Sequence, residues 1–170
     1  MANPPLRIRR LLDDLNAAHA EFEAALASVD PALRDAPGLV GQWSARELVG
    51  HLGYWAGEAT EAIHRAEQDE LDAYGADELS VDERNAVVAR VAHEADFATV
   101  AAREQAAFSA FSARLARVDP EWLTATDADG DALEEIIKFD GADHYREHTA
   151  DLRAWFTGEP DADDDADADA

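Results

Sequence analysis

Two histidines near the end of the chain, His144 and His148, stand four residues apart in the sequence H-Y-R-E-H. On an α-helix, residues at this spacing have Cβ atoms about 5–6 Å apart, so both imidazoles can reach one metal ion at about 2.0–2.1 Å. A third histidine, His51, shares an apolar helical stripe with Leu48 and Trp55, where a neutral imidazole needs a hydrogen bond or a metal. The spacing of His144 and His148 alone favours ordinary pairing with neighbouring acids, but three inward histidines on two helices suggest one common site, for which a divalent metal is the other interpretation.

The other histidines fit such a site less well. His19 lies on an apolar stripe and is either a fourth ligand or a core residue, and we favour the core interpretation. His64 and His93 have polar neighbours at helical spacing, so we expect both to be exposed.

Several acidic and amide side chains are candidates to assist the histidines. Glu58 follows His51 by one heptad on the same helix face, which makes it a candidate general base for catalysis, with a surface glutamate as the alternative. Asn85, Asp140 and Asp143 are candidates to orient the ligands. In a chain with 38 acidic residues, a carboxylate near a histidine is weak evidence.

The elements that must position these residues are helical. Apolar residues recur with a period of 3.6 and no segment alternates with period two for long enough to form a strand. Two capping boxes, Ser44 to Glu47 and Ser80 to Glu83, mark helix starts. We expect an all-α four-helix bundle with a short extra helix before the third long one, over residues 6–29, 44–75, 80–91, 97–118 and 133–156, the last kinked at Gly141.

The chain divides into one bundle, residues 1–157, and an acidic tail, residues 158–170. The tail carries only alanine among apolar residues and a run of aspartates that repel one another, so we expect it to be disordered.

The formal net charge of −24 limits the partners. Such a field repels phosphates and anionic lipid headgroups, so we expect neither nucleic acid nor membrane as a partner. With no long apolar run and no signal peptide, a cytoplasmic location is expected. The many carboxylates and the single lysine, Lys138, are typical of halophile proteins from a salt-rich cytoplasm, and a high-GC genome is the alternative explanation.

Two sequence blocks resemble the DinB-like superfamily of metal-binding four-helix bundles: G-Q-W-S-A-R-E-L-V-G-H-L-G-Y-W, which ends at Trp55, and D-H-Y-R-E-H-T-A-D-L-R-A-W-F, which begins at Asp143. The resemblance implies that His51, His144 and His148 bind a divalent metal. It is strongest to the branch of mycothiol-dependent maleylpyruvate isomerase metal-binding domains, with ClbS/DfsB-type bundles as neighbours.

Three neutral imidazoles leave an ion, for which zinc, nickel and iron are candidates, with an open position. The chain has no cysteine, so thiol chemistry would need a low-molecular-weight thiol cosubstrate. The resemblance implies a thiol-dependent S-transferase or isomerase, which would join a small-molecule thiol to an electrophile, and the missing cysteine fits this expectation. A non-catalytic metal- or ligand-binding or protein-interaction bundle is the alternative. The four tryptophans serve either the core or an interface, and we expect a homodimer.

Overall fold

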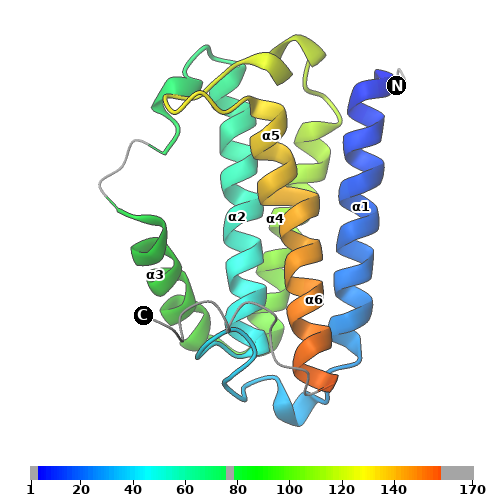
Figure 1. Ribbon diagram of the computed structural model, residues 1–170, viewed down its shortest axis with the longest axis vertical. Coiled ribbons are helices and arrows are strands. Elements are labelled where there is room, and N and C mark those ends of the chain that lie inside the picture. Colours follow the sequence, from blue (N-terminus) through cyan, green and yellow to red (C-terminus); the bar gives the residue numbers. More distant parts are fainter. Residues whose placement is uncertain (1–3, 76–78, 158–170) are drawn as a thin grey trace, which may run out of the picture.

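The structure, a computed structural model, describes residues 4–75 and 79–157. Four long helical segments run side by side (Figure 1): α1 (Leu6–Ala27), α2 (Ala45–Ala66), α4 (Phe97–Leu115), and α5 (Leu133–Lys138) continued by α6 (His144–Thr157). The extra short helix is α3 (Val81–His93), which stands beside α2. The described residues contain isolated bridges but no strand, so the predicted all-α bundle is confirmed.

Short 3-10 turns link these helices: η1 (Pro31–Leu33), η2 (Leu71–Ala73) and η3 (Pro120–Thr124). Among the described helices, none is long and apolar enough to cross a membrane. The predicted disordered tail, residues 158–170, lies outside the described residues.

The core forms where the apolar stripes of the long helices face one another. Helix α2 packs along α4, and α1 packs along α6. The largest fully buried side chains include Phe22, Leu48, Phe111 and Leu152, one from each of these four helices. Burying a side chain of this size contributes about 1.5–3 kcal/mol, so the stripes decide how the helices pair.

Both predicted capping boxes are present. The Ser44 backbone N–H donates to the Glu47 carboxylate at 2.6 Å. At the start of α3 the bonds are reciprocal: Ser80 N–H donates to the Glu83 carboxylate at 2.9 Å, and Glu83 N–H donates to Ser80 Oγ at 3.3 Å. These bonds satisfy amides that a helix start leaves without intrahelical partners.

The predicted end of the second helix is wrong. We expected it near Tyr74, but α2 ends at Ala66. Asp69 adopts a left-handed φ of 60°, and the Glu70 amide donates back to the Arg65 carbonyl at 2.9 Å. This closing turn satisfies the last carbonyls and turns the chain away from the helix axis.

The predicted kink at Gly141 is confirmed as a π-helical turn, η4 (Phe139–Asp143), between α5 and α6. Gly141 itself has non-helical angles, φ −109° and ψ −109°. A Cβ there would lie 3.1 Å from Phe111 Cε1 and 3.3 Å from Leu15 Cδ1, so the turn packs closely on α1 and α4. A π turn holds one residue more than an α turn, and such turns are frequent at functional sites.

Helices α2 and α4 approach most closely at Gly53. A Cβ added there would lie 2.9 Å from the backbone Cα of Glu104, whereas one added at Gly57, one turn later, would meet no atom within 4 Å. Gly53 therefore sets the spacing of the two helices, and Gly57 does not.

We expect Gly53→Ala to lower the free energy of unfolding by about 1–3 kcal/mol, because the new methyl group collides with backbone. The matched variant Gly57→Ala should raise it by up to about 1 kcal/mol, since alanine favours the helix and nothing obstructs it. Urea unfolding of both variants measures the difference. Equal effects of the two substitutions would contradict the close approach.

Candidate metal centre

The structure brings His51, His144 and His148 together between α2 and α6. The Nε2 atoms of His51 and His144 are 2.8 Å apart. The ring centroids are separated by 4.7 Å for His51 and His144, 4.8 Å for His144 and His148, and 5.1 Å for His51 and His148. One ligand atom from each of the three lies within 4.8 Å of the others. The spacing and stripe positions of the three histidines thus bring them together in space.

The donor set fits a divalent ion. Nitrogens bound to one ion at about 2.0–2.1 Å lie about 3–3.5 Å apart, which is near the observed separation. Hydrogen bonding alone does not satisfy the cluster. In a bond between the Nε2 atoms of His51 and His144, one Nε2 accepts, so that ring carries its single proton on Nδ1 and needs a second partner there. The Nδ1 atoms of His51 and His144 are buried and have no hydrogen-bond partner among the described residues.

His148 is oriented by a carboxylate. Its Nδ1 donates to Asp151 Oδ2 at 2.6 Å, one helical turn further along α6. This bond leaves Nε2 of His148 free to face the other imidazoles. A carboxylate behind a histidine fixes the ring and increases its basicity, as commonly occurs at metal sites.

Burial keeps two of the imidazoles neutral. Desolvation, with the neighbouring His148 as a second cause, lowers the pKa of His51 to about 3. The same two causes, in the same order, lower the pKa of His144 to about 3. Neutral imidazole is the form that binds metals, so these two rings need not lose a proton when an ion enters near pH 7.

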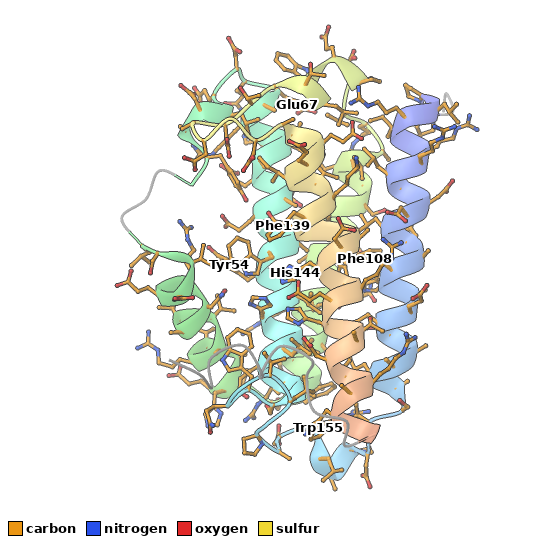
Figure 2. The ribbon with its side chains drawn as sticks, in the orientation of Figure 1. Tyr54, Glu67, Phe108, Phe139, His144 and Trp155 are labelled. Carbon is orange, nitrogen blue, oxygen red and sulfur yellow. The ribbon has the colours of Figure 1, made fainter. Side chains whose placement is uncertain are left out.

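A cavity of about 710 Å³ opens above the three histidines. Its walls come from the loops before α2 and before α5, from α2 and α3, from Tyr74 just after η2, and from the last helix with its π turn. They include Trp43, Trp55 and Phe139. Figure 2 shows Phe139 and His144 along the side of the last helix that faces α2. Their rings stack at 6.5 Å between centroids. A volume of this size accommodates a small organic ligand.

Asp140 lies in the wall of this cavity and is 5 % exposed. The Tyr74 hydroxyl donates to its Oδ2 at 3.2 Å. Desolvation raises the pKa of Asp140 to about 7, against the opposing effect of the Tyr74 hydrogen bond. A carboxyl group with this pKa can accept or release a proton near neutrality.

The other predicted assisting residues differ in position. Asn85 lines the cavity and accepts a hydrogen bond from Trp55 Nε1 at 3.1 Å. Glu58 is not among the residues that line it, and one of its oxygens lies 3.9 Å from Arg84 on α3. Asp143 is exposed and pairs with Arg146 at 3.6 Å, because it lies on the outer side of the last helix.

The three remaining histidines lie outside the cluster. His19 is buried, stacks on Phe108 with centroids 3.6 Å apart, and donates from Nε2 to Glu104 at 3.2 Å. This is the core position that we favoured. His64 and His93 are exposed, as predicted.

Sequence reasoning named Asp151 only as an ordinary partner of the histidines, in the alternative without a metal, and it did not single out Tyr74 or Trp43 for this site. Asp151 had a usable signal, because it follows His148 by three residues on one helix face. Tyr74 and Trp43 had none, because they lie in irregular segments whose path across the bundle is set by tertiary packing.

Comparisons with known proteins identify the fold. No family model matches the chain, and no curated protein matches it. Among solved structures, the colibactin self-resistance protein ClbS in complex with a dsDNA superposes with a TM-score of 0.70 at 15% sequence identity, over 86% of this chain and 93% of that chain. The chain has a ClbS-like helical fold. At this identity, the likeness to ClbS establishes the architecture.

The ClbS complex corrects one prediction. We expected the negative charge to exclude nucleic acid as a partner, yet the similar ClbS structure contains double-stranded DNA. Net charge describes the field far from a molecule, whereas binding depends on the local arrangement of cations on one surface. The exclusion of nucleic acid from the charge of this chain was therefore wrong.

The lowered pKa values predict how stability depends on pH. Between pH 6.5 and about 3, His51 and His144 are more protonated in the unfolded chain than in the folded one. The free energy of unfolding must therefore fall as the pH is lowered through this window. From about pH 6.5 to about pH 5, the loss should be roughly 1–2 kcal/mol per histidine.

Urea unfolding measures how much the two histidines contribute to the pH dependence of the free energy of unfolding. It is carried out with a chelator present, on the wild type and on a His51→Gln, His144→Gln double variant. We expect the wild-type free energy of unfolding to fall more steeply with acid than that of the variant. The raised pKa of Asp140 acts in the opposite direction. This opposing contribution is common to both proteins if Asp140 keeps its environment in the variant. Parallel curves would show that the two imidazoles are not held neutral by the fold.

Proposed function

We propose that this protein is a divalent-metal-binding bundle in which His51, His144 and His148 hold the ion. The observation that carries the proposal is the convergence of three imidazoles, with ligand atoms within 4.8 Å of one another, beside a cavity of about 710 Å³. Three protein ligands leave an ion with an open position for a substrate, as in catalytic sites. Zinc, nickel and iron all accept imidazole ligands.

The reaction that we propose joins a small-molecule thiol to an electrophile. A divalent ion in this position would stabilise the thiolate form of a bound thiol. The chain provides no cysteine, so the sulfur must come from a cosubstrate. The thiol proton passes to a carboxylate of the cavity wall, the sulfur forms a bond to an electrophilic carbon, and the leaving group departs with the bonding electrons.

Three groups of the chain support this chemistry. Asp151 holds the ring of His148 in place through Nδ1. Asp140, with a pKa of about 7, is our candidate proton acceptor, and the aromatic walls limit the access of water. The predicted role of Glu58 as a general base stays a prediction, and its position near Arg84 favours Asp140 instead.

Elemental analysis of protein purified without a histidine tag tests the metal site. We expect about one ion per chain, lost in a His144→Ala, His148→Ala variant because two of the three ligands are gone. Asp151→Asn should weaken metal affinity by about 10–100-fold. The matched control is His64→Ala, His93→Ala, which removes two exposed imidazoles and should keep the ion. Absence of metal from the wild type would contradict the site.

The same preparations test the thiol reaction. Metal-loaded protein is mixed with a panel of small thiols and 1-chloro-2,4-dinitrobenzene, and the release of chloride is followed. We expect the rate to fall in Asp140→Asn without loss of metal. A loaded protein that binds thiols but gives no turnover would favour the alternative, a non-catalytic binding bundle.

Double-stranded DNA is a second candidate ligand, favoured by the ClbS complex. Phosphate contacts need cations, and α1 begins with Arg7, Arg9 and Arg10, of which Arg7 pairs with Glu134. Fluorescence anisotropy with a labelled duplex should show binding that weakens between about 50 and 200 mM salt as counterions compete. Arg9→Ala, Arg10→Ala should reduce it. No binding at the lower salt concentration would remove this candidate.

A further inference from the structure

The cavity above the histidines is lined by more carboxylates than one divalent ion on the histidines would neutralise. No lysine or arginine is among its described lining residues. Its five carboxylates are those of Asp127, Asp131, Glu135, Asp140 and Glu147. Within the described part of the chain, none of these five takes part in an ion pair with a lysine or an arginine. Charges of one sign in a cavity with low-dielectric walls focus the field and raise the local concentration of the opposite ion.

The basic side chains with described ion pairs lie against carboxylates outside the cavity, for example Arg65 against Glu61 at 2.9 Å and Arg46 against Asp35 at 3.4 Å. Among the described residues, no lysine or arginine lines the cavity. The carboxylates of its wall therefore meet no basic side chain there that would compete with a cationic ligand.

Aromatic side chains stand among these carboxylates. Trp43, Trp55, Tyr74 and Phe139 line the same cavity. Phe139 is 71 % exposed, and Val81, another lining residue, is 55 % exposed, so apolar surface at the cavity is left in water. Aromatic faces attract cations, and each such contact contributes about 0.5–2 kcal/mol of binding free energy. Tryptophan is the most effective of the aromatic side chains. Acids and aromatic rings together therefore favour a ligand that is both positively charged and apolar.

A further observation marks this cavity as a binding site. His51, 5 % exposed, lies in its wall and carries an Nδ1 atom without a hydrogen-bond partner among the described residues. Buried polar atoms are usually paired, so an unpaired one on a residue of the wall marks a place for a ligand or an ion, whatever the charge of that ligand. The volume of about 710 Å³ is in the range of small organic ligands.

We propose that the cavity takes an organic cation, in which a positively charged nitrogen is joined to an apolar or aromatic body. The carboxylates of the wall attract the charged nitrogen through their combined field, and the aromatic rings of the wall receive the apolar body. This inference rests on the proposed function, since it names the class of electrophilic substrate that reaches the histidine site. Anionic electrophiles are disfavoured by the same field.

Isothermal titration calorimetry at fixed ionic strength tests the charge preference. The probes are (1-naphthylmethyl)trimethylammonium and 1-naphthalenesulfonate, which share an aromatic body and differ in charge. Wild-type, metal-loaded protein should bind the cation about tenfold or more tightly than the anion. A triple variant of the cavity wall should abolish this preference, because it keeps the size of the side chains and removes three negative charges. Its substitutions are Asp131→Asn, Glu135→Gln and Glu147→Gln.

The matched control removes three exposed carboxylates that do not line the cavity, and it should keep the preference for the cation. Its substitutions are Asp13→Asn, Glu21→Gln and Glu94→Gln. Equal affinity of wild type for the two probes, or equal effects of the two triple variants, would overturn the proposal. Metal content is measured on every sample. A wild type that holds its metal but shows no charge preference defeats this inference alone. A wild type that shows the preference but holds no metal defeats the proposed function and supports cation binding.

Discussion

The arrangement of the bundle depends on one buried carboxylate. Glu104 is 2 % exposed and accepts hydrogen bonds from the Tyr145 hydroxyl at 2.6 Å and from His19 Nε2 at 3.2 Å. Its backbone also lies against Gly53, so this single residue contacts α1, α2 and α6 from its place on α4. Burial and the Glu104 charge raise the pKa of Tyr145, which keeps the hydroxyl protonated as a donor. Removing one partner would leave a buried polar group unpaired, which is strongly destabilising.

The histidine cluster follows from this network because Tyr145 is next to His144 in the chain. The hydrogen bond of the Tyr145 hydroxyl to Glu104 restricts the rotation of α6 about its axis. On the adjacent side of the same helix, the rings of His144 and His148 contact His51 of α2. One face of α6 thus belongs to the core, and the adjacent face belongs to the cavity. The polar network sets the angle between them.

Much of this arrangement could be predicted from the sequence, because periodicity and caps are local signals. The stripe that contains His51 and the spacing of His144 and His148 suggested one site, the resemblance to DinB-like bundles favoured a metal there, and the three side chains do meet. The predicted end of α2 was wrong because the sequence after Glu67 gives no sign of the left-handed turn at Asp69. The role of Glu104 was missed for a related reason: a glutamate in an amphipathic pattern reads as a surface residue, and only tertiary contacts bury it.

The cavity could not be predicted from the sequence. Its acidic residues come from a loop, α5, η4 and α6, and its aromatic rings come from four different segments. No period in the sequence links them. The excess of negative charge was visible in the sequence but was interpreted as a property of the whole surface. Which acids gather beside aromatic rings around one cavity depends on the residues that meet in space.

The π turn at Phe139–Asp143 places the two halves of the last helix out of phase by one residue, or about 100° of rotation. Phe139 and His144 are five residues apart and stack, which a regular α-helix would prevent. A related chain with a regular last helix would therefore align with this one only through a one-residue gap at Gly141. An ungapped alignment through this turn would match either the core residues of α5 or the histidines of α6, but not both.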